Sequence, residues 1–71
     1  QVLERTQLAA VKQAVMALPD RQRAALMMRK YQELEYAEIA EALDCSEDSA
    51  RANVYQALKK LREQFAEVED E

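Results

Sequence analysis

The chain has 71 residues, which allows one small domain, and the absence of glycine favours helices over strands joined by tight turns. Hydrophobic residues make up 49% and charged residues 34%, which is too apolar for a disordered segment. The sequence has no apolar run long enough to predict a membrane-spanning helix. The net charge is −4, and the excess of acidic residues is concentrated at the C-terminus. Residues 1–62 hold ten basic and nine acidic residues and are therefore nearly neutral, so DNA binding is not excluded.

The first two predicted helices are separated by a proline. Apolar residues recur at spacings of three and four from about Val2 to Leu18, which predicts an amphipathic helix. Pro19 ends it, because proline lacks a backbone donor and disfavours helical geometry in the preceding residue. Asp20 is predicted to cap a second helix that runs to about Gln32, on which Arg23 would be a solvated charge.

A third helix is predicted over about Tyr36 to Leu43. Asp44 and Cys45 then form a turn, because aspartate tolerates the left-handed backbone conformation better than most residues, and Cys45 would be a small structural hydrophobe there. Ser46 is a strong N-cap candidate for a fourth helix that extends to about Ala66.

The fourth helix has two different faces. One is apolar, with residues at spacings of three and four. The other face is polar and presents Arg51, Ala52, Tyr55, Lys59 and Arg62, with Asn53 and Gln56 on its flanks.

The fourth helix would complete a domain over residues 1–66, and residues 67–71 would form an acidic C-terminal tail.

Two helices joined by the three-residue turn at positions 44–46 match a helix-turn-helix. Small and apolar side chains let the two helices cross closely, and the outer face of the second helix can then enter a major groove. The side chains expected at this crossing are Ala40, Leu43, Ala50 and Val54.

The residues needed for catalysis or metal binding are missing. With no histidine and Cys45 as the only cysteine, neither a disulfide within the chain nor a Cys/His zinc site can form. There is also no glycine-rich phosphate loop and no signal peptide. We therefore expect a cytoplasmic protein that is not an enzyme and holds no cofactor.

The ordered motifs resemble region 4 of bacterial sigma factors, in particular the extracytoplasmic-function group. The similar segments, which together span about Val11 to Phe65, are Ala17–Arg23 with its LP-x-x-x-R opening, Leu26–Arg29, Glu33–Ala40, Leu43–Ser46 and Ala57–Arg62. The resemblance implies an all-α, four-helix domain of the winged-helix-like sigma region 4 type, with a helix-turn-helix and no wing.

The resemblance also implies partners and contacts. In that family the domain recognises the −35 promoter element and docks on the flap of the RNA polymerase β subunit, and anti-sigma factors commonly mask it. The positions where the family contacts bases or phosphates fall here on Arg29, Tyr36, Arg51, Ala52, Asn53, Tyr55, Gln56 and Lys59.

Several positions depart from the family pattern. Asn53, Gln56 and Leu58 stand where arginine or lysine is common, although the amide side chains of Asn53 and Gln56 can still pair with adenine. Glu47 and Asp48 add negative charge where the helix approaches the groove. Because phosphate attraction supplies much of the affinity for DNA, we expect the isolated domain to bind weakly.

Two alternatives stay open. The low basic content also fits a sigma-like interaction module that captures an anti-sigma factor without binding DNA. The DNA-binding domains of two-component and quorum-sensing regulators share the four-helix pattern, but the LP-x-x-x-R opening and the closing Lys59–Arg62 favour the sigma family.

Overall fold

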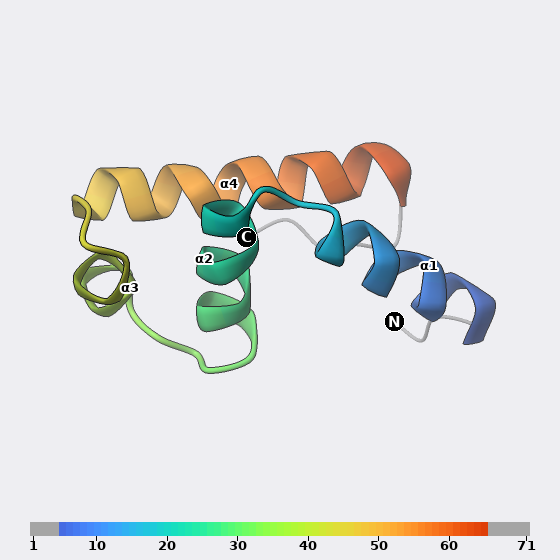
Figure 1. Cartoon of the computed structure of the whole chain (residues 1–71), viewed down its shortest axis with the longest axis horizontal. Helices are drawn as coiled ribbons and strands as arrows, with labels where there is room; N and C mark the ends of the chain where they lie inside the picture. The colour runs from blue at the N-terminus through green and yellow to red at the C-terminus, as the bar shows by residue number, and fades with distance from the viewer. Residues whose placement is uncertain (1–4, 66–71) are drawn as a thin grey trace.

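The computed structural model describes residues 5–65, with side chains from Leu8 onward, as four helices without strands (Figure 1). This confirms the all-α prediction. The predicted start at Val2 and the acidic tail at 67–71 lie outside the described residues. The helices are α1 (Arg5–Met16), α2 (Asp20–Lys30), α3 (Tyr36–Leu43) and α4 (Glu47–Gln64).

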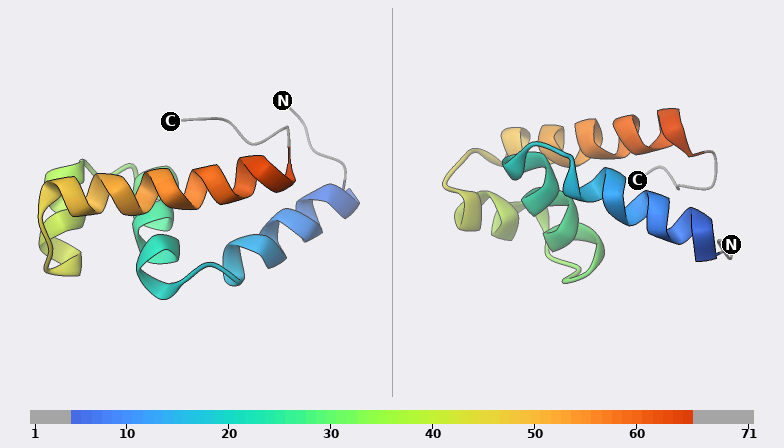
Figure 2. Two further views of the ribbon diagram at one scale, coloured as in Figure 1. Left: turned by 90° about the horizontal axis from the view of Figure 1, so that it is seen from above. Right: turned by 45° about the vertical axis from the view of Figure 1, so that its right-hand side comes forward.

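Helix α4 forms the long axis of the molecule, and the other helices pack against it. Helix α3 lies at the beginning of α4, α2 crosses its middle, and α1 extends beside its C-terminal half (Figures 1 and 2). Alanines at the contacts let the helices approach closely. The buried core consists of Leu18, Ala25, Leu26, Ile39, Ala40, Ala50, Val54, Ala57, Leu58 and Leu61.

The turn between α3 and α4 forms as predicted. Asp44 adopts the left-handed conformation, with φ 55° and ψ 53°, and the backbone N–H of Cys45 donates to the carbonyl of Ala40 over 2.9 Å. This pattern ends a helix and reverses the chain. The Ser46 hydroxyl oxygen accepts a hydrogen bond of 3.0 Å from the Ser49 N–H, which confirms the predicted N-cap of α4.

The junction between α1 and α2 corrects two predictions. Pro19, not Asp20, is the N-cap residue of α2, and the carboxylate of Asp20 instead accepts a hydrogen bond of 2.8 Å from Arg23. Arg23 is not a solvated charge, because its Nη1 donates to the carbonyl of Met16 over 3.0 Å and to that of Leu18 over 3.5 Å. The arginine of the LP-x-x-x-R motif thus caps the carbonyl end of α1 and ties it to α2.

Both of the first two helices end two residues earlier than predicted, at Met16 and Lys30. After α2 the chain turns through Glu33, which has a left-handed φ of 57°, and the N–H of Leu34 donates to the carbonyl of Met28 over 3.0 Å. These contacts close the helix end, and apolar periodicity does not reveal them.

Replacing Arg23 by alanine is expected to lower the free energy of unfolding by about 1–2 kcal/mol, because its charged hydrogen bonds to the carbonyls of Met16 and Leu18 are lost. Urea denaturation followed by circular dichroism measures this change. Arg21→Ala, which removes the same charge from an exposed position on the same helix, should change the free energy by no more than about 0.5 kcal/mol. Equal effects of the two substitutions would contradict a structural role for Arg23.

Candidate nucleic-acid interface

The outward face of α4 carries most of the residues that the sequence singles out. Arg51, Ala52, Tyr55, Gln56 and Lys59 are all exposed, while the opposite face of the helix is buried against α2 and α3. Tyr55 is 51% exposed, so its ring lies on the surface and is not part of the packing between helices. The structure thus gathers these five side chains on one accessible face.

Arg51 is held by groups from two helices. Its Nη1 lies 3.2 Å from Oδ1 of Asp48, and its Nη2 lies 3.8 Å from Oε1 of Glu47, both in the first turn of α4. Its guanidinium carbon also lies 4.8 Å from the ring centroid of Tyr36, at the start of α3. Arg51 is half exposed, so a phosphate or a base edge can still reach it.

Arg29 supports the same corner of the molecule from α2. Its guanidinium carbon lies 4.4 Å from the ring centroid of Tyr36, and its Nη1 donates to the carbonyl of Leu34 over 3.0 Å. The carboxylate of Glu35 lies 3.9 Å away, and the Arg29 side chain is 25% exposed. These contacts fix the connection between α2 and α3, and they place Tyr36 beside both arginines.

Two of the amide side chains of α4, Asn53 and Gln56, have different surroundings. The Asn53 Nδ2 donates to the carbonyl of Ser49 in its own helix over 3.0 Å, and the residue is half-buried. Gln56 is exposed one turn along the outward face. Gln56 is therefore the amide that is better placed to meet a base.

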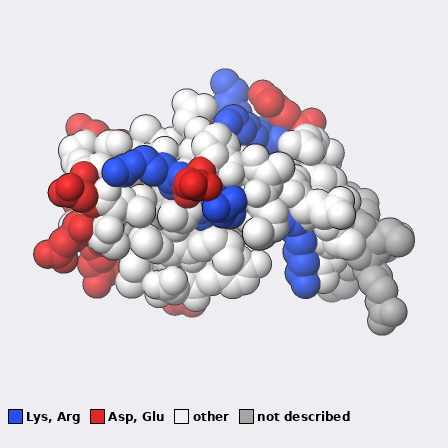
Figure 3. All heavy atoms as spheres, in the orientation of Figure 1, with Lys and Arg blue, Asp and Glu red and all other residues white. Residues whose placement is uncertain are grey.

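Negative charge surrounds the start of this face. Residues 33–48 carry seven carboxylates and no lysine or arginine. In Figure 3, acidic side chains gather at the end of the molecule where α3 meets α4, and basic ones lie further along the surface. The near balance of charge over residues 1–62 conceals this contrast, which is visible in the sequence of residues 33–48. The carboxylates belong to Glu33, Glu35, Glu38, Glu41, Asp44, Glu47 and Asp48.

A second surface, the α1–α2 groove, is apolar. Its most exposed large hydrophobic side chains are Tyr31 at 76% and Met16 at 67%, followed by Leu8 at 43% and Met27 at 38%, and Lys12 and Lys30 also line it. The groove comprises two adjoining hollows of about 270 and 420 Å³, both lined by Val11, Val15, Met27 and Tyr31. The periodicity of the first helix predicted an apolar face, and the structure leaves part of this face uncovered.

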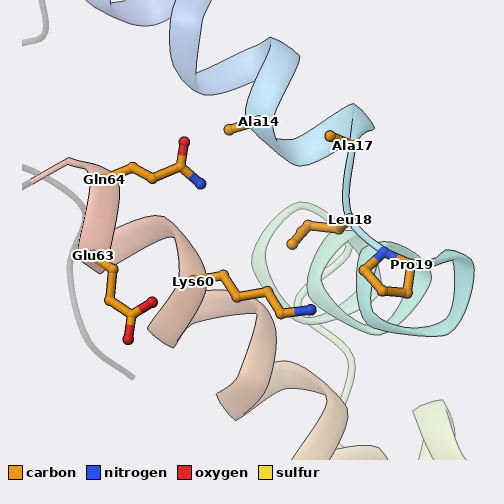
Figure 4. Close-up of a pocket in the computed structure, with 7 residues that line it drawn as sticks. All are labelled: Ala14, Ala17, Leu18, Pro19, Lys60, Glu63 and Gln64. Carbon is orange, nitrogen blue, oxygen red and sulfur yellow. The ribbon is translucent and has the colours of Figure 1, made fainter.

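A third hollow of about 240 Å³ lies where the end of α1, the start of α2 and the end of α4 meet (Figure 4). The Lys60 side chain extends across it toward Leu18 and Pro19.

Within residues 5–65, no group of histidine, cysteine, aspartate or glutamate side chains could hold a metal ion. None of the described helices is long and apolar enough to cross a membrane.

A capped helix with an outward polar face, set against a short helix by a tight turn, defines a helix-turn-helix domain. Residues 8–61, well over half of the chain, match the family described as Sigma-70, region 4. The chain belongs to this family of DNA-binding transcription-factor domains, whose general role is recognition of the −35 promoter element together with RNA polymerase. No curated protein sequence matches the chain.

Proposed function

We propose that this domain reads the −35 promoter element for a sigma factor of the extracytoplasmic-function group, using the outward face of α4. The observation that carries the proposal is the exposed set Arg51, Ala52, Tyr55, Gln56 and Lys59 on a helix whose start is fixed by Ser46. Side chains near the start of such a helix reach deepest into the major groove.

The chemistry of each side chain suggests its task. Arg51 can pair with a phosphate or with guanine, and Gln56 can pair with adenine through its amide. The Tyr55 ring can pack against a thymine methyl. The neighbouring Ala52 is small, so the DNA can approach the helix closely there. Lys59, one turn further on, suits a phosphate. Arg29, Tyr36 and Asn53 remain proposed contacts, and the bonds that they make within the protein point to a positioning role.

Gln56→Ala is expected to relax sequence preference at one base pair by about 1–3 kcal/mol, with little effect on binding to shuffled DNA. Fluorescence anisotropy with a −35-like duplex, its single-base variants and a shuffled duplex measures the preference. Arg21→Ala, at an exposed position outside the proposed interface, serves as control. Unchanged selectivity in Gln56→Ala would remove this residue from the base-reading set.

We also propose the α1–α2 groove as the surface that docks on the polymerase β flap. The groove reaches Leu58 and Leu61 on the inner side of α4, opposite the DNA-reading face, so both partners can bind at once. Its apolar lining suits the apolar face of a partner helix. An anti-sigma factor that covers this groove would block assembly with the polymerase.

The alternative of a module that binds only an anti-sigma factor is favoured by the seven carboxylates at residues 33–48. A gel shift at about 50 mM salt distinguishes the two functions, because phosphate attraction is strongest at low salt. No shift of a −35-like duplex, together with intact binding of an anti-sigma factor, would support the alternative.

A further inference from the structure

We propose that Glu47 and Asp48 restrain Arg51 and thereby set the affinity of the domain for polyanions below the level that its basic residues would otherwise give. The restraint is intramolecular: the two carboxylates compete with phosphate for the same guanidinium. Where the competing anion is promoter DNA, the inference rests on the proposed function.

The contacts show a direct competition. The carboxylates pair with both terminal nitrogens of Arg51: Nη1 donates a hydrogen bond of 3.2 Å to Asp48, and Nη2 forms a longer ion pair of 3.8 Å with Glu47. A phosphate binds arginine most strongly through the same two nitrogens. A bidentate contact of DNA with these two nitrogens therefore competes with both internal ion pairs, and most directly with the hydrogen bond from Arg51 to Asp48.

The neighbouring groups hold Arg51 where the two carboxylates can reach it. The Tyr36 ring on α3 lies 4.8 Å from the guanidinium carbon, and Arg29 on α2 lies 4.4 Å from the same ring. The i, i+3 and i, i+4 spacings on α4 bring Asp48 and Glu47 to the arginine without bending the helix. Asp48 is 97% exposed, so its carboxylate is able to return to water when Arg51 leaves it.

The exchange has a signature in salt dependence. Arg51 releases a counterion from DNA when it binds a phosphate, and this release makes affinity fall as salt rises. If Arg51 leaves a carboxylate, that carboxylate takes up a cation and offsets part of the release. Self-pairing should therefore lower the affinity and also flatten its dependence on salt.

The test uses a double variant that combines Glu47→Gln with Asp48→Asn, which removes the two charges and keeps side-chain size. The matched control combines Glu33→Gln with Glu41→Gln, which removes two exposed charges from the same acidic stretch that are not ion-pair partners of Arg51. Both double variants are also made with Arg51→Ala. Binding to a −35-like duplex is measured against salt, and the salt that elutes each variant from immobilised heparin reports on a polyanion without bases.

We expect the double variant of Glu47 and Asp48 to bind the duplex about two- to fivefold more tightly, the range of exposed ion pairs, and with a steeper salt dependence. It should also need more salt for elution from heparin. The control variant should gain less in both assays, and the gain should vanish when Arg51 is replaced by alanine. An equal gain with Arg51→Ala would overturn the proposal, since the carboxylates would then act by repelling phosphate directly.

The experiments can disprove the restraint of Arg51 and the reading of promoter DNA independently of each other. If the test variant and the control variant behave alike on heparin and on DNA, the restraint is wrong, while sequence-dependent duplex binding would leave promoter reading in place. If the gain on heparin appears without preference for the −35-like duplex, the restraint holds and promoter reading is wrong. Circular dichroism checks folding, and Asp48→Asn alone provides a milder variant that keeps one carboxylate in the first turn.

Discussion

Replacing Ile39 by alanine is expected to lower the free energy of unfolding by about 2–5 kcal/mol, the range for large-to-small substitutions in cores. Among the residues that the structure describes, Ile39 and Val54 are the two largest side chains that are completely enclosed. A domain of this size has only roughly 4–11 kcal/mol of stability in total. Thermal denaturation should therefore show a large fall in the midpoint, and a substantial unfolded fraction at 37 °C.

Ile39 joins the two helices of the helix-turn-helix, because it is the large buried side chain of α3 in a core built mainly by α4. Two controls test whether lost volume is the cause. Ile39→Val should cost only about 0.5–1.5 kcal/mol, and Leu8→Ala, at an exposed position on α1, should change little. A small loss for Ile39→Ala would mean that α3 repacks and that the α3–α4 geometry is not fixed by this residue.

Arg51→Ala is expected to weaken binding to both −35-like and shuffled duplexes by about five- to tenfold at low salt, which is the low end of the 1–3 kcal/mol range for such contacts. The low end applies because DNA must compete with two carboxylates for the arginine. The slope of log affinity against log salt should fall by less than about one, the value for a full phosphate contact, because the carboxylates that Arg51 leaves take up cations. Anisotropy titrations from about 50 to 200 mM salt measure both quantities.

Folding is not expected to account for this loss. The interactions of Arg51 are exposed ion pairs and a ring contact, which contribute at most about 1 kcal/mol each. Arg21→Ala removes an equal charge outside the proposed interface and should leave the affinity nearly unchanged. Equal affinity losses in Arg51→Ala and Arg21→Ala would show that net charge, and not the α4 face, governs binding.

The parts of the fold that the sequence predicts well are those with local signals. The turn residues Asp44 and Ser46 act on their own backbone, so they mark the end of α3 and the start of α4. Arg23 is misassigned because it binds the Met16 carbonyl at the end of α1, which only the packed structure brings within reach, and Asp20 is misassigned because its carboxylate pairs with Arg23. Local propensity cannot show which end of another helix an arginine will cap.

In the candidate site, too, the sequence predicts the features that depend on one helix but not those that depend on the packing of several helices. Helical periodicity predicts that Arg51, Tyr55 and Gln56 face outward, and they are exposed. Periodicity cannot predict that Tyr36 lies beside both Arg29 and Arg51, because these residues come from three helices. Nor can it show which part of an apolar helix face is left uncovered, since that depends on how far the neighbouring helices extend.

The incomplete cover of α1 has a consequence for its dynamics. None of its described side chains, from Leu8 onward, is fully buried, so local opening of this helix should cost less than global unfolding, and its amides should exchange first with deuterium. A ligand that binds only the closed form would raise this opening free energy through linkage. Protection of the α1 amides would then report occupancy of the groove without any change in α4.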